Sequence, residues 1–457
     1  MDYHYLKKAQ ELIKDGNVEF VRIEVADLNG CSRGFLLNAH FFIANCETGF
    51  GITQSILAMP SDGQVLFDIG MTKDISYRDM GLYPDITTFQ ILPWLEKTAS
   101  VMADAREKME DEESELHPCV PRNICRNQVD KLWETHGLRL YSTYEYEFYL
   151  VDEKTGARAN NEVNTLSTQI MSHHEHIATD IMRNMIKIGI SPERFHTEYA
   201  KGQFEVSQSP TLGVSCPDNA FRTKQLVKEI ARKHGYKAIW MSKPFPNESG
   251  SSAHFNHSLR NGDGDNVFYD PDMQYGLSKI ARSWLAGLVH HSDALLALAS
   301  TTPNCFERSN TGGFAPINNA WGLDNRSVAF RTKKHGSKKV YFEVRLPGAA
   351  TNPYLFEAGC IIAGMDGVRN EMVLKGDPYE GDITAEKVLP DHISALPKSL
   401  SAALDCLLGK RVFMDEIGEE FLNIYSGLKK HEDKMAEEHR EQGDLFEWYM
   451  DFFGERV

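Results

Sequence analysis

The sequence predicts an α+β protein with two domains, and three observations support this. Its 457 residues are enough for two domains, or for one large domain with an appendage. Helical patterns alternate with strand patterns along most of the chain. An acidic stretch that ends in two prolines, "REKMEDEESELHPCVPRN", interrupts them near residues 111–121. We therefore expect a small N-terminal domain over residues 1–112 and a larger domain over residues 113–457.

The N-terminal segment predicts one helix followed by strands. The helix is expected near Tyr3–Lys14. Residues alternate on either side of Asn29 and Gly30 in "VEFVRIEVADLNGCSRGFLL", which is typical of a β-hairpin with a tight turn. The stretches "TTFQILPW" and "TASVMADA" indicate further strands.

The larger segment predicts strands interleaved with helices. Helical patterns cover Asn127–His136 and Asp218–His234, and strand patterns include "YSTYEYEFYL", "GQFEVSQ" and "KKVYFEVRL". One long amphipathic helix is expected over "MQYGLSKIARSWLAGLVHHSDALLALAS". Another is expected to begin near Pro353, because proline is favoured in the first turn of a helix. Charged helices follow from Asp415 onward.

Composition limits the classes of function. Hydrophobic residues make up 42% and charged residues 25%, which is ordinary for a globular protein with a core. The net charge of −16 argues against a nucleic-acid partner. No apolar run approaches the ~18–20 residues of a membrane helix, and "MDYHYLKKAQ" lacks a signal-peptide pattern. The eight cysteines show no C-x-x-C spacing and are most simply explained as reduced thiols, so we expect a cytoplasmic protein.

The stretch "STYEYEFYL" places two carboxylates on one face of a strand. Because side chains alternate with period two, Glu145 and Glu147 share a face, and Tyr144, Tyr146 and Phe148 take the other. Two like charges on a half-buried surface repel and disfavour each other's ionisation. Either this is a solvent-facing strand edge, or a cation lies between the glutamates.

Three further segments repeat this pattern and favour a cation. Glu198 and Glu205 lie in "HTEYAKGQFEVS", and Glu343 and Arg345 share a strand face in "VYFEVRLPG". His254 follows a Gly/Ser-rich loop in "KPFPNESGSSAHFNHSL", and taken alone it is better explained as a core histidine. Oxygen-rich ligand sets favour Mg²⁺ or Mn²⁺ over zinc.

These segments carry a family resemblance. The motifs "EYE", "EYAKGQFE", "GSSAH", "WGLDNRSVAFR" and "EVRLPGAATNPYL" occur in the order found in bacterial-type members of the glutamine synthetase superfamily. With "DMGLYPDITTFQILPW", the resemblance covers nearly the whole chain. "FVRIEVADLNGCSRG" is similar to the lengsin branch, and the "LPGA" and "NAWG" variants look like γ-glutamyl amide ligases. The resemblance implies a β-grasp-like N-terminal domain. It also implies a catalytic domain whose curved antiparallel sheet is flanked by helices.

The resemblance also implies two divalent ions in each site. Members of the family hold them in a funnel lined by antiparallel strands, so the paired glutamates of the first motif would face different ions. The residues that match the ligands of the first ion are Glu147, Glu198 and Glu205, and those of the second ion are Glu145, His254 and Glu343.

Other positions match substrate residues of the family. Arg308 matches the arginine that clamps the substrate carboxylate, Arg345 matches a substrate-side arginine, and Gly250 lies where a loop receives the substrate amino group. A planar guanidinium suits bidentate binding of a carboxylate.

Four positions match the nucleotide side of the family site. Arg326 and Arg331 match groups that hold the transferred phosphate and ATP, and Lys338 and Ser258 lie near the nucleotide. The arginines fit phosphoryl transfer, because its catalysis is mostly positioning and charge stabilisation. For Arg331 and Lys338 a solvated surface position is the alternative.

The chain departs from the glutamine synthetase pattern where ammonium binds. Phe314 in "RSNTGGFAP" stands where the family has a glutamate that deprotonates ammonium, and "GFGITQSILAMPSDGQ" lacks a clear F-D-G-S-S motif. A larger amine could instead pack on Phe314. Asn256 replaces the second histidine of H-x-H, with His257 on the opposite face, and Tyr341 stands where an adenine-side arginine is common.

The resemblance therefore implies an ATP-dependent ligase that joins glutamate to an organic amine. The alternative is a lengsin-like structural protein that keeps the fold and loses the chemistry. Either is expected as a homo-oligomer, by analogy a dodecamer of two hexameric rings. The chain has no P-loop motif.

One further cluster needs an explanation. "SHHEH" (His173, His174, Glu175 and His176) could bind a metal, but we expect a solvated loop in a polar linker before a helix.

Overall fold

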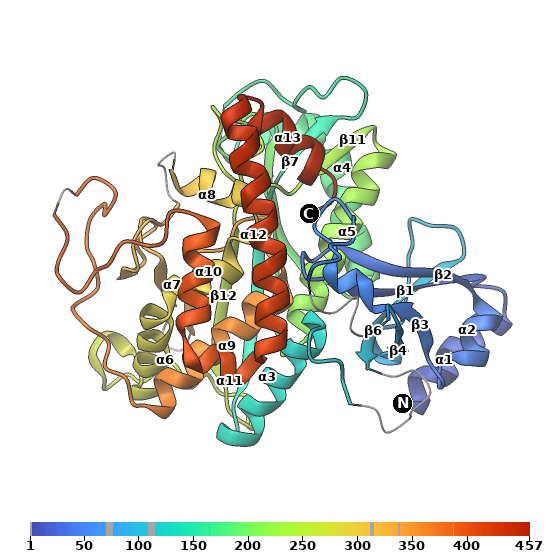
Figure 1. Cartoon of the computed structure of the whole chain (residues 1–457), viewed down its shortest axis with the longest axis horizontal. Coiled ribbons are helices and arrows are strands. Elements are labelled where there is room, and N and C mark those ends of the chain that lie inside the picture. Colours follow the sequence, from blue (N-terminus) through green and yellow to red (C-terminus); the bar gives the residue numbers. More distant parts are fainter. Residues whose placement is uncertain are drawn as a thin grey trace.

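The computed structural model describes residues 2–69, 76–107, 115–163, 165–310, 315–336, 339–386 and 388–457. A small N-terminal body, blue in Figure 1, lies beside a larger body that carries the remaining helices and strands. The α+β class is confirmed. The predicted boundary between residues 112 and 113 falls outside the described residues, so the division into domains at that point stays a prediction.

The N-terminal body is a mixed sheet with short helices. Its strands follow the order β2-β1-β6-β4-β3, with β5 paired to β6, and β1 runs parallel to β6 while the other pairs are antiparallel. The elements are α1 (Tyr3–Lys14), β1 (Phe20–Ala26), β2 (Ser32–Asn38), α2 (Ala39–Asn45), β3 (Phe50–Thr53), η1 (Gln54–Ala58), β4 (Asp79–Pro84), η2 (Ile86–Thr88), β5 (Gln90–Ile91) and β6 (Thr98–Arg106).

The predicted hairpin between β1 and β2 is confirmed, and its turn contacts the larger body. Gly30 adopts a φ of 78°, which suits glycine in a tight turn. A Cβ at this position would come within 3.3 Å of the Asn352 backbone. The Asn352 side chain donates to the carbonyl of Asp27 at 3.0 Å, so the turn is held against the start of a helix of the larger body.

The larger body is built on one sheet with the order β13-β14-β15-β12-β7-β9-β8, and β10 and β11 also pair with β7. Its pairs are antiparallel as expected, except that β13 runs parallel to β14. The strands are β7 (Arg139–Asp152), β8 (Pro192–Thr197), β9 (Gln203–Gln208), β10 (Thr211–Leu212), β11 (Tyr236–Ile239), β12 (Ala253–Arg260), β13 (Trp321–Leu323), β14 (Phe330–His335) and β15 (Lys339–Val344).

Helices cover this sheet. They are α3 (Pro121–His136), α4 (Thr168–Lys187), α5 (Ser215–Lys233), η3 (Gln274–Gly276), α6 (Lys279–His290), α7 (Ser292–Ala299), α8 (Pro303–Asn310), α9 (Pro353–Arg369), α10 (Leu400–Gly409), α11 (Arg411–Ile417), α12 (Glu419–Gln442) and α13 (Leu445–Phe453). Within the described ranges, none has the length and apolarity that a bilayer crossing requires.

The aromatic face of β7 forms the core, as its sequence predicts. Tyr144, Tyr146 and Phe148 are each at most 1% exposed. The Tyr144 hydroxyl donates to the carbonyl of Pro353 at the start of α9 at 2.8 Å, and Phe148 stacks on Trp240 at 4.8 Å between ring centroids. The carboxylates of β7 are thereby directed to the other face.

Two helix predictions were wrong in detail. The expected long helix near residues 273–300 is two helices, because the backbone leaves helical geometry at His291, with φ −102° and ψ 13°. Both halves are apolar, so the sequence pattern does not reveal a break of one residue. The "SHHEH" cluster lies inside α4, because Ser167 caps that helix by accepting from the amide of Ile170 at 3.2 Å.

A buried arginine joins the two bodies. Arg122 of α3 is 1% exposed and donates to Asp85 and Asp104 of the N-terminal body and to Asp218 of α5. Burial opposes the ionisation of Asp85, but Arg122 outweighs burial and lowers the pKa of this carboxyl to about 2. Three carboxylates around one guanidinium fix how the bodies meet.

The buried carboxyl of Glu357 makes the stability of the fold depend on pH. This residue of α9 is fully buried and accepts from the Ser142 hydroxyl at 3.0 Å, and burial raises the pKa of its carboxyl to about 8 from 4.5. Between these pH values the unfolded chain releases the proton and the folded chain keeps it, so stability falls as pH rises.

Glu357→Gln should remove this loss. We expect the variant to match the wild type near pH 4.5 and to exceed it by a few kcal/mol, roughly 2–4, near pH 9. Urea unfolding at both pH values measures the difference. Glu371→Gln, at an exposed position, serves as the control. A constant difference between the two pH values would contradict the prediction.

Candidate active site

The register of the strands brings the predicted polar residues to one face of the large sheet. Glu145 of β7 pairs with His254 of β12, and Glu147 of β7 pairs with Glu205 of β9. Residues that pair directly across strands project from the same face. The two glutamates of β7 and their two partners therefore face the same side.

The row continues across β15 and β14. Asn256 of β12 pairs with Glu343 of β15, which in turn pairs with Arg331 of β14. On the opposite flank His196 of β8 pairs with Glu205. Glu198 lies immediately after the end of β8 rather than on a strand.

The acidic flank forms a compact cluster. The two ring nitrogens of His196 lie 3.4 Å from Glu198 and 3.3 Å from Glu205, and one ligand atom from each residue lies within 4.8 Å of the others. Glu147 borders this cluster and accepts from the amide and hydroxyl of Ser252 at 2.9 and 2.7 Å. Carboxylates and an imidazole at this spacing suit a hard divalent cation.

The protonation of these carboxylates reflects their crowding. Burial, followed by repulsion from Glu147 and Glu205, raises the pKa of Glu198 to about 8. Burial, followed by repulsion from Glu205, raises the pKa of Glu145 to about 7 and also raises that of Glu147. Burial opposes a charge on His196, but Glu205 and Glu198 outweigh burial and raise the pKa of its imidazole, which therefore partly compensates this flank.

The other flank is rich in positive charge around one carboxylate. The carboxylate of Glu343 is only 1% exposed and forms ion pairs with three cations. These are Arg345 at 2.5 Å, Arg331 at 3.0 Å and Lys333 at 3.2 Å, and the His254 ring lies 3.9 Å away. Burial opposes its ionisation, but His254 and these three cations outweigh burial and hold the pKa of Glu343 well below its usual range.

The predicted substrate residues are grouped beside this flank. Arg308 of α8 is buried and donates to the backbone carbonyls of Leu346 and Arg345 at 3.2 Å each. A Cβ at Gly250 would lie 2.6 Å from the Arg308 side chain, so glycine allows the two segments to meet. Burial lowers the pKa of Arg308 to about 10. The carboxylate of Glu147 opposes this effect, because it favours the charged form of the guanidinium.

The nucleotide-side predictions are more scattered. Arg326 lies exposed in the turn between β13 and β14, where it lines an open pocket of about 510 Å³ together with Tyr379 and Glu380. Arg331 links this pocket to Glu343, because its Nε also donates to Asp324 in the pocket wall at 3.1 Å. Ser258 is buried in β12. Phe314 and Lys338 lie outside the described residues.

Asn256 is buried with its polar atoms unsatisfied. The side chain is 5% exposed, and neither atom of its amide has a hydrogen-bond partner in the described part of the chain. Ser207, which pairs with Glu145 across β7 and β9, also has a buried hydroxyl without a hydrogen-bond partner among the described residues. Buried polar groups normally find a partner, so these two favour a bound polar ligand on this face.

The sequence analysis missed His196 and Lys333. Strand periodicity points to Lys333, which lies two residues after Arg331 and so projects from the same face, and His196 opens the segment "HTEYAKGQFEVS" that carries Glu198 and Glu205.

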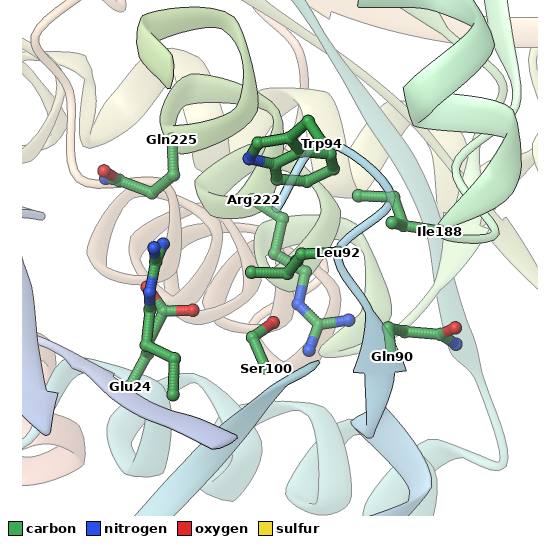
Figure 2. A pocket seen from close by; sticks show the side chains of 9 residues that line it. Glu24, Gln90, Leu92, Trp94, Ser100, Ile188, Arg222 and Gln225 are labelled. Carbon is green, nitrogen blue, oxygen red and sulfur yellow. The ribbon is translucent and has the colours of Figure 1, made fainter. Parts of the chain in front are cut away.

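A second cavity lies between the two bodies, away from this face. Figure 2 shows Glu24, Trp94 and Arg222 around it. Its volume of about 10 Å³ has room for one water molecule. It cannot hold a substrate.

Comparison with known proteins identifies the family. Residues 118–449 match the catalytic domain of glutamine synthetase. Glutamate–isopropylamine ligase from a Pseudomonas species is 31% identical over 94% of this chain and 94% of its own length. The chain belongs to the glutamine synthetase family of ligases. The resemblance predicted from the motifs is confirmed.

Other members of the glutamine synthetase family are comparably similar. Glutamine synthetase from Thermotoga maritima is 31% identical over 92% of this chain and 94% of its own. Lengsin from Canis lupus familiaris is 29% identical over 96% of this chain and 75% of its own. A solved GmaS/ADP complex shares the fold, with a TM-score of 0.83 at 24% identity over 97% of this chain and 98% of its own.

The acidic cluster predicts a response to metal. Mn²⁺ should raise the melting temperature of the metal-free protein, because it relieves repulsion among Glu147, Glu198 and Glu205. At 100 times the dissociation constant, the gain is about 2.7 kcal/mol. Thermal unfolding with and without Mn²⁺ measures it. In the double variant Glu198→Gln/Glu205→Gln the shift should fall by more than half, and an undiminished shift would contradict this site.

Proposed function

We propose that the protein is an ATP-dependent ligase that joins the side-chain carboxyl of glutamate to an organic amine. In the first step ATP would phosphorylate glutamate, and in the second the amine would displace phosphate and form a γ-glutamyl amide. The observation that carries the proposal is the single sheet face that bears carboxylates, an imidazole and arginines together. Phosphoryl transfer needs such positioning and charge stabilisation.

Two Mg²⁺ or Mn²⁺ ions fit the donor atoms of this face. We propose that the first is held by Glu147, Glu198 and Glu205, with His196 beside them, and the second by Glu145, His254 and Glu343. When bound, such ions neutralise the charge that develops on the transferred phosphoryl group. The raised pKa of Glu198 and Glu145 supports the assignment, since a divalent ion would remove their mutual repulsion.

The arginines supply fixed positive charge for the substrates. We propose that Arg308 and Arg345 bind glutamate, with Gly250 at the amino group, because Arg308 and Gly250 are in close contact. Arg326, Arg331, Lys338 and Ser258 are proposed for the nucleotide side. The unsatisfied amide of Asn256 is a further candidate for a substrate or nucleotide hydrogen bond.

An organic amine is favoured over ammonium. Ammonium binding requires compact acidic groups, and Phe314 stands where the family uses a glutamate. An aromatic ring suits an amine with an apolar part. The similarity to glutamate–isopropylamine ligase agrees with an alkylamine.

A structural role is the second candidate. Similarity to lengsin over 96% of this chain favours it. The buried carboxylates oppose it, because such groups are costly without a cation and serve no purpose in a retired site. In either case we propose a cytoplasmic homo-oligomer, by analogy a dodecamer of two hexameric rings. A light-scattering mass near that of one chain would contradict the oligomer.

The experiment is a phosphate-release assay with ATP, Mg²⁺ and glutamate against ammonium and a panel of alkylamines and polyamines. We expect turnover with at least one organic amine at a kcat/KM well above that for ammonium. The Phe314→Glu variant should shift the preference toward ammonium, and Phe306→Leu, a buried aromatic position of α8, provides a matched control.

Two outcomes would contradict the proposal. Preference for ammonium would reject the organic amine while retaining the ligase. Absence of turnover with every amine, in a folded protein that binds no nucleotide with Mg²⁺, would favour the structural role.

A further inference from the structure

Lys333 introduces a cation at the place proposed for the second metal ion. Its ammonium lies 3.2 Å from Glu343 Oε2, and its side chain is 13% exposed. It pairs across β14 and β15 with Tyr341, and its Nζ lies 5.2 Å from the centroid of that ring. The ammonium of Lys333 therefore lies in direct contact with Glu343, one of the three proposed ligands.

Both oxygens of Glu343 are already engaged by cations. Oε1 receives Arg345 at 2.5 Å, and Oε2 receives Arg331 at 3.0 Å and Lys333 at 3.2 Å. A divalent ion that uses Glu343 must take a lone pair from one of them. Arg331 is also anchored on Asp324 at 3.1 Å, whereas lysine carries its charge on a flexible four-carbon stem. Lys333 is thus the cation best able to move away.

We propose that Lys333 is a built-in competitor of the second divalent ion and weakens its binding at Glu145, His254 and Glu343. The inference rests on the two-metal site of the proposed function. At Glu198 and Glu205 the partner at this distance is the imidazole of His196, at 3.4 and 3.3 Å, rather than a lysine ammonium, so we expect the site at Glu147, Glu198 and Glu205 to bind more tightly. The site at Glu145, His254 and Glu343 binds only when the ammonium of Lys333 withdraws, and its residual charge repels the ion.

The test is a Mn²⁺ titration of the metal-free, full-length protein, followed by calorimetry and by electron paramagnetic resonance of free Mn²⁺. We expect one tight site and one site at least roughly tenfold weaker. Lys333→Met should strengthen the weaker site about tenfold or more and leave the tight site unchanged, because it removes a charge beside Glu343 and keeps the length of the stem.

Two variants serve as controls. Lys334→Met removes the same charge from the next residue, which is exposed and lies over the Tyr269 ring on the other face, so it should titrate like the wild type. Lys333→Arg retains a cation and should keep the weaker site weak. Thermal unfolding establishes that each variant is folded, and Lys333→Gln replaces Lys333→Met if that variant does not fold.

The outcomes separate this inference from the proposed function. Two sites of equal affinity in the wild type, or a weaker site that Lys333→Met leaves unchanged, would overturn the role of Lys333 while the two-metal site stands. Equal strengthening of both sites, or the same change in Lys334→Met, would also overturn it, because it would be a general effect of net charge. Absence of any Mn²⁺ binding would instead reject the metal site of the proposed function, and this inference with it.

Discussion

The pairing register of β7 is the constraint on which the rest of the site depends. This strand of 14 residues pairs with four others, and at its middle it sets Glu145 against His254 and Glu147 against Glu205. A slip of one residue would turn both glutamates into the aromatic core and expose Tyr144 and Tyr146. The apolar side therefore enforces the register, since burying a tyrosine or phenylalanine there is worth a few kcal/mol. The same register holds the glutamates of the polar face close together, although the repulsion among them opposes this arrangement.

The two flanks of the site are electrostatically unlike. Around Glu343, two arginines and a lysine hold the carboxyl ionised, so this flank is compensated by the protein itself. Around Glu198, His196 offers partial compensation, and burial with repulsion raises the pKa of the carboxyls. The proposed two-ion site is therefore electrostatically asymmetric. The asymmetry follows from where the cations around Glu343 lie: Arg331 and Lys333 are on β14 and Arg345 directly follows β15, far from β8 and β9 in the order of the sheet.

Much of this arrangement could be predicted from the sequence. Strand alternation gave the shared face of Glu145 and Glu147, and the Asn29–Gly30 turn gave the hairpin. Motif order then brought residues from distant segments into one site, which periodicity alone cannot do, because strand order and register are set by tertiary packing. The break at His291 left no local signal in two apolar stretches.

Two residues of the site stand beside the family positions rather than at them. His196 is the first residue of "HTEYAKGQFEVS" and pairs across strands with Glu205, and Lys333 lies two residues after Arg331 on β14. The helix that contains "SHHEH" begins after the cap at Ser167, five residues upstream of Ser172, where the preceding residues are mostly polar.

The central claim is that six side chains from separate segments surround two divalent ions on one face of the sheet. Anomalous diffraction from crystals grown with Mn²⁺ tests it most directly. We predict two peaks, one within coordination distance of Glu147, Glu198 and Glu205, and one within coordination distance of Glu145, His254 and Glu343. Peaks bound by other residues, or ordered density in which these six side chains point away from any shared ion, would contradict the account.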